Sequence, residues 1–97
     1  MDDRFRELKE ATAAALLRGP GATAAELRQA CAGGEAPAEL RALVEAIDRR
    51  PSEVTDADLA ELRAKYSEDE LFEIIVAAAF GAADRRLQAG LRALEQA

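Results

Sequence analysis

The stretch from Leu71 to Ala83 constrains this sequence more than any other, because Glu73 is its only charged residue. A helix that is apolar on all sides needs cover on all sides. Unbroken from Glu68 to Gln96, such a helix would be about 43 Å long. A compact domain of this size has a radius of gyration of only about 13 Å. We therefore predict that this helix either bends or packs partly against another subunit.

Two glycines within this segment add a second expectation. Gly81 and Gly90 each cost about 1 kcal/mol relative to alanine in a helix interior. They are nine residues apart, which places them on opposite faces. The cost indicates a close backbone contact or a bend, and simple tolerance of the glycines is the alternative.

Capping and breaking signals predict five helices in all. The first is expected over about 2–18, where Gly-Pro-Gly stops it. The fifth is expected to start at Ser67, with Glu70 as its capping partner, and to run toward the C-terminus. Between them, helices are expected to begin at Thr23 with Glu26 as a capping box, near Pro37, and at Thr55 with Asp58. No strand-like alternation is present. The sequence thus predicts an all-α fold in a single domain, 1–97, with the long alanine-rich fifth helix at its core.

Charge and composition restrict the classes of partner. The formal net charge is −6, so an approach to phosphate backbones is disfavoured and no nucleic-acid partner is expected. The N-terminus lacks the apolar segment of a signal peptide, and the longest uncharged run is too short to cross a bilayer, so no membrane contact is expected. The single cysteine suits a reducing compartment, which indicates a cytoplasmic location.

The residue inventory also restricts the chemistry. The chain has no histidine, so it has no imidazole base and no histidine metal ligand. Cys31 lies on the apolar side of the second helix and is expected to be a buried structural residue. Short acidic sets are typical of the first turns of helices rather than of paired catalytic carboxylates. No catalytic residue, metal or cofactor is expected.

The fifth helix is therefore the expected site of function. We predict that it forms the interface of a homo-oligomer through Phe72, Ile75, Val76, Ala79, Phe80, Ala83, Leu87, Leu91 and Leu94. A polar site of Tyr66, Glu73 and Arg86 is a further possibility. Glu73 is expected either to be an exposed first-turn residue or to pair with an arginine, for which Arg85 or Arg86 of a second subunit is a candidate.

The second half of the chain carries four runs with a recognisable order, namely Thr-Asp-Ala-Asp-Leu (55–59), Leu-Arg-Ala (62–64), Ser-Glu-Asp-Glu-Leu-Phe-Glu (67–73) and Ala-Ala-Ala (77–79). From Val54 to about Leu94, these runs resemble the carboxymuconolactone decarboxylase and alkylhydroperoxidase-D family. The resemblance implies a helical domain that forms homo-oligomers.

The catalytic groups of that family are not present at the matching positions. The Cys-x-x-Cys-x-x-x-His run of its peroxidases falls on Arg50, Glu53 and Ala57, and Lys65 replaces the turn glycine. Neither thiol peroxidase nor decarboxylase activity is therefore expected. The predicted function is a non-catalytic helical interaction or scaffold protein. One alternative is a small-ligand binder or enzyme with an apolar pocket beside the fifth helix, and another is a small regulator that imitates a helix-turn-helix.

Overall fold

The computed structural model describes residues 3–96, and all regular structure in that range is helical. The five α-helices are α1 (Asp3–Arg18), α2 (Ala25–Ala32), α3 (Arg41–Arg49), α4 (Asp56–Ala60) and α5 (Glu68–Gln96). Three short 3₁₀ turns join them, η1 (Ala38–Leu40), η2 (Pro51–Glu53) and η3 (Leu62–Ala64). The predicted all-α fold with a long final helix is confirmed. The predicted helix start at Asp2 and the terminal Ala97 lie outside the described residues.

Local signals explain most helix boundaries. At α5, the Ser67 N–H donates to the Glu70 carboxylate at 2.8 Å, and the Glu70 N–H donates to the Ser67 hydroxyl at 3.1 Å. At α4, the Thr55 N–H donates to the Asp58 carboxylate at 2.8 Å. Both predicted capping boxes are therefore confirmed.

The predicted cap of the second helix is wrong. The N-cap residue of α2 is Ala24, which has no side-chain cap. The Thr23 hydroxyl instead donates to the carboxylate of Glu73, which lies on α5. A tertiary partner has replaced the local one, since the Thr23 N–H and the Thr23 hydroxyl both donate to the Glu73 carboxylate.

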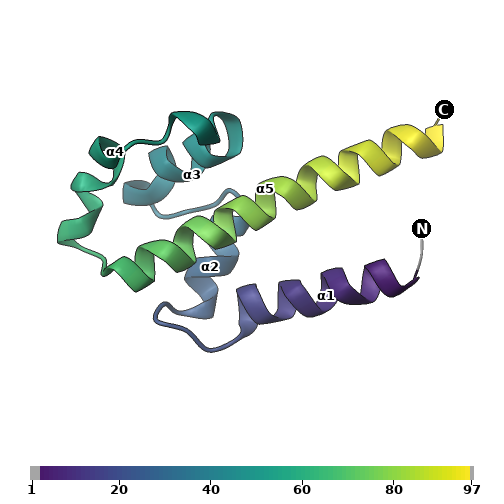
Figure 1. Ribbon diagram of the computed structural model, residues 1–97, viewed down its shortest axis with the longest axis horizontal. Coiled ribbons are helices and arrows are strands. Elements are labelled where there is room, and N and C mark those ends of the chain that lie inside the picture. Colours follow the sequence, from purple (N-terminus) through teal and green to yellow (C-terminus); the bar gives the residue numbers. More distant parts are fainter. Residues whose placement is uncertain (1–2, 97) are drawn as a thin grey trace.

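The hydrophobic core lies between one side of α5 and the helices α2 and α3. Its largest fully buried side chains are Cys31, Leu40 and Ile74, and Leu43, Val44 and Ile47 of α3 belong to the same cluster. Figure 1 shows that α5 runs along nearly the whole molecule, while α2, α3 and α4 gather around its first half. Arg85 and Arg86, just past the middle of α5, reach the ends of α2 and α3. Further along, α1 lies beside α5 and runs in the opposite direction.

The fifth helix does not break or bend sharply. It is continuous over 29 residues, and the longest dimension of the molecule is 46 Å. A β-carbon added at Gly81 would lie 1.9 Å from the carbonyl oxygen of Ala32, so the glycine admits the end of α2 against α5. The predicted close backbone contact is thus confirmed at Gly81. A β-carbon at Gly90 would meet nothing within 4 Å.

Candidate functional site

The predicted interface residues form one uncovered side of α5, which we call the outer face. None of them is buried, and Phe72 and Leu94 expose 68% and 71% of their surface. Ile75 lies at the edge of this set and packs partly against the core. The outer face comprises Phe72, Ile75, Val76, Ala79, Phe80, Ala83, Leu87, Leu91 and Leu94. The buried residues of α5, such as Ile74 and Ala78, lie on its opposite side.

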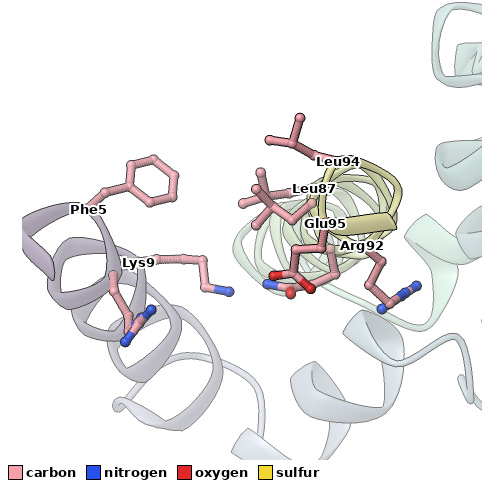
Figure 2. Close-up of a pocket in the computed structure, with 9 residues that line it drawn as sticks. Phe5, Lys9, Leu87, Arg92, Leu94 and Glu95 are labelled. Carbon is pink, nitrogen blue, oxygen red and sulfur yellow. The ribbon is translucent and has the colours of Figure 1, made fainter. Parts of the chain in front are cut away.

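The first helix extends this apolar surface. No residue of α1 is buried, and Phe5 and Leu8 are 46% and 62% exposed. Figure 2 shows Phe5 of α1 and Leu87 and Leu94 of α5 pointing toward the same open side of the groove between the two helices. The sequence predicted the helix α1. It did not predict that the apolar side of α1 would remain exposed to solvent.

A groove with a volume of about 520 Å³ lies between α1 and α5. Its apolar lining consists of Phe5, Leu87, Leu91 and Leu94. Its polar lining consists of Arg6, Lys9, Gln88, Arg92 and Glu95. The Lys9 ammonium forms an ion pair at 3.0 Å with Asp84, which ties α1 to α5. The lining of the groove therefore combines four apolar residues with charges of both signs.

Glu73 anchors the loop between α1 and α2 to α5. Its carboxylate accepts hydrogen bonds from the Ala22 N–H at 2.7 Å, the Thr23 N–H at 2.9 Å and the Thr23 hydroxyl at 2.6 Å. A β-carbon at Gly21 would lie 2.7 Å from the same carboxylate, so a glycine is needed for this approach. Glu73 is half-buried, so the expectation that it is an exposed first-turn residue is wrong.

Buried Arg28 lies beneath the same loop. Its guanidinium donates to the carbonyl oxygens of Leu16, at 2.8 Å, and of Gly19. Its Nε lies 3.9 Å from the Glu73 carboxylate and has no hydrogen-bond partner in the structure. Because carbonyls at the end of a helix lack partners within the helix, Arg28 completes the C-terminus of α1.

Hydrogen bonding lowers the pKa of Glu73 to about 2, chiefly through the Thr23 hydroxyl and then through the Ala22 and Thr23 N–H groups. A carboxylate with a folded-state pKa below its ordinary value stabilises the fold at neutral pH and loses that contribution as pH falls from about 4.5 toward 2. We expect Glu73→Gln to remove this part of the acid sensitivity. The check is urea unfolding of both chains at pH 6, 4 and 2, in which the difference in their free energies of unfolding should shrink as pH falls. A difference that stays constant over this range would contradict the assignment.

The residues of the possible polar site lie in three separate places. The Tyr66 hydroxyl donates to Glu39 at 2.6 Å, and this bond is the largest contribution raising the pKa of Tyr66 to about 12. Arg86 donates to the carbonyl oxygen of Asp48, at the end of α3. Glu73 holds the α1–α2 loop, as described above. The structure does not bring these three side chains together.

A recurring arginine contact was not foreseen from the sequence. Arg28 donates to the carbonyl of Leu16 at the end of α1, Arg85 to that of Ala32 at the end of α2, and Arg86 to that of Asp48 at the end of α3. Each arginine lies on another helix than the one whose end it contacts. Sequence spacing carries no signal for such contacts, since the partners are up to 53 residues apart.

The remaining chemistry is limited. Cys31 is fully buried, and burial raises the pKa of its thiol, which disfavours the reactive thiolate. Residues 3–96 contain no group of three or more acidic or cysteine side chains placed to hold a metal ion. Across the same range, no helix is both long enough and apolar enough to span a membrane.

No protein-family model, curated protein or solved structure matches this chain.

Proposed function

We propose that this protein is a non-catalytic helical interaction protein that assembles with copies of itself through the outer face of α5. One observation carries this proposal. The long helix is buried on one side by α2 and α3, while its opposite side keeps large apolar side chains such as Phe72 and Leu94 in contact with solvent. A continuous apolar surface of this kind is typical of a protein–protein interface.

The test compares two substitutions that introduce the same charge into the same helix. Ala83 lies on the outer face, whereas Ala89 is also exposed but lies about 120° away around the helix. We expect Ala83→Glu to weaken self-association about a hundredfold or more, because it buries an unpaired carboxylate in the interface. Ala89→Glu should leave self-association unchanged.

Sedimentation velocity over a concentration series measures both variants against the wild-type chain. Circular dichroism confirms that each variant keeps its helices. Equal association of Ala83→Glu and the wild-type chain would contradict the use of this face.

A small-ligand binder is the second candidate, and the groove between α1 and α5 favours it. Sites for small molecules commonly have volumes of about 300–1,000 Å³, and the volume of this groove lies in that range. Its apolar residues together with Arg6 and Arg92 suit an amphipathic anion. Anilinonaphthalene sulfonate combines apolar rings with a sulfonate, and its fluorescence should rise when it binds the wild-type chain. This rise should be absent with Leu91→Asn. Equal fluorescence with both chains would exclude the groove as the binding site.

We also propose that residues 54–94 derive from the carboxymuconolactone decarboxylase and alkylhydroperoxidase-D family without its catalytic groups. Support comes from the order of α4, a tight turn, the Ser67 cap and the alanine-rich α5. A cytoplasmic location, which the single unpaired cysteine favours, is part of the same proposal.

A further inference from the structure

The outer face, together with Gly90 beside it, contains a regular stripe. Along α5, residues that are exposed or half-buried follow one another at spacings of four, three and four, and this set of spacings then repeats. We call this set the stripe, and its members are Phe72, Val76, Ala79, Ala83, Leu87, Gly90 and Leu94. The repeat of eleven residues corresponds to about 3.67 residues per turn, close to the 3.6 of a straight helix. The stripe therefore stays on one side of α5 throughout its length.

The stripe is symmetric about Ala83. Phe72 and Leu94 lie eleven residues on either side of Ala83, and Ala79 and Leu87 lie four residues on either side. Val76 and Gly90, at seven residues, complete the set. When one copy of α5 lies antiparallel to another with Ala83 opposite Ala83, each member of the stripe faces another member.

The facing pairs also match in size. The large Leu87 side chain meets the small Ala79, Val76 meets Gly90, and the central position brings two alanines together. The open space beside Gly90, where an added β-carbon would meet nothing within 4 Å, leaves room for Val76 of a second chain. Among residues 3–96, no atom lies close enough to Gly90 to require a glycine at this position. A glycine nevertheless costs about 1 kcal/mol in a helix. Phe72 and Leu94, both large and exposed, close the two ends.

The charges and the area are compatible with such a pair. The stripe contains no ionisable residue. Asp84, beside its centre, is already neutralised by Lys9. The stripe is about 33 Å long and a helix is about 10 Å wide. At about 330 Å² per copy, the stripe accounts for about 660 Å² over two copies. The exposed side of α1, which includes Phe5 and Leu8, must supply the rest of the roughly 1,000 Å² expected of a specific interface.

We propose that the occupant of the outer face is a second copy of this chain, related by a two-fold axis that passes beside Ala83, with the two α5 helices antiparallel. The inference rests on the proposed function and adds to it the orientation and register of the partner. Contacts across a two-fold interface are reciprocal, so that residue i of one copy meets residue j of the other and the reverse. A stripe that is symmetric about Ala83 meets this condition. In this arrangement α1 of each copy lies on the same flank of the paired α5 helices.

Cysteine cross-linking tests the orientation. The wild-type chain is the control, because its Cys31 is fully buried. Under mild oxidation, Ala83→Cys should form a covalent dimer with itself. Leu94→Cys alone should not, since the two copies of residue 94 would lie about 33 Å apart along the helices. A mixture of Phe72→Cys and Leu94→Cys should form a covalent heterodimer.

The outcomes separate this inference from the proposed function. A chain that is monomeric by sedimentation contradicts both. A chain that dimerises while Leu94→Cys alone cross-links as fully as Ala83→Cys has a parallel interface, which overturns only the antiparallel pairing. A dimer in which neither Ala83→Cys nor the mixture cross-links also overturns the pairing.

A second variant examines the register without cross-linking. Gly90→Leu fills the space assigned to Val76 of the partner, while it removes a glycine from an exposed helix position. We expect self-association about tenfold weaker than in the wild-type chain, with undiminished helix content by circular dichroism. Unchanged self-association would overturn the register.

Discussion

Gly81→Ala is expected to destabilise the fold by about 3 kcal/mol, a large part of the stability of a small domain. The added β-carbon would lie 1.9 Å from the carbonyl oxygen and 2.6 Å from the carbonyl carbon of Ala32. Both atoms belong to backbone, which cannot turn aside as a flexible side chain can. Relief therefore requires α2 to move away from α5, and this motion opens the core around Cys31.

Urea unfolding followed by circular dichroism measures the effect. Gly90→Ala is the matched control, because it makes the same substitution in the same helix where no atom lies within 4 Å. The control should gain up to about 1 kcal/mol from the higher helix propensity of alanine. A Gly81→Ala chain that unfolds at the wild-type urea concentration would show that α2 does not approach α5 this closely.

Arg28→Ala is expected to cost about 3 kcal/mol and to release α1. Removing the guanidinium leaves the carbonyls of Leu16 and Gly19 without their donor and takes away the cation beside Glu73. The first helix has no buried residue of its own, so these contacts provide much of what holds it. Lys9 of α1 also donates to Asp84 of α5, and Gln29 of α2 donates to the carbonyl oxygen of Leu17.

Amide hydrogen exchange gives the most specific measure of this change. In Arg28→Ala, the amides of α1 should lose protection to a greater extent than those of α3. Arg63→Ala is the control, because the Arg63 side chain is 43% exposed and its ion pairs with Asp56 and Glu68 lie at the surface. Such pairs contribute about 0–1 kcal/mol. Equal protection of α1 in both variants would show that Arg28 does not secure this helix.

The sequence was sufficient to predict those features that depend on neighbouring residues. The capping boxes at Thr55 and Ser67 involve residues three apart, and the helices begin where these boxes predict. Hydrophobic spacing likewise placed Leu40, Leu43 and Ile47 on one buried side of the third helix. The close contact at Gly81 was expected from the cost of a glycine in a helix.

Features that depend on distant residues were not predicted. Thr23 followed a local capping pattern, yet its hydroxyl bonds to Glu73, 50 residues away. In the sequence, nothing distinguishes the three arginines that complete helix C-termini from arginines at the protein surface. The symmetry of the stripe became visible only when the structure separated the buried side of α5 from the uncovered one.

The molar mass of the unmodified chain in solution, measured by light scattering at micromolar concentrations, tests most directly whether the outer face of α5 is an interface. We predict a mass of twice the 10.4 kDa of one chain, falling toward the monomer value on dilution. A constant mass of 10.4 kDa across the micromolar range would contradict self-association.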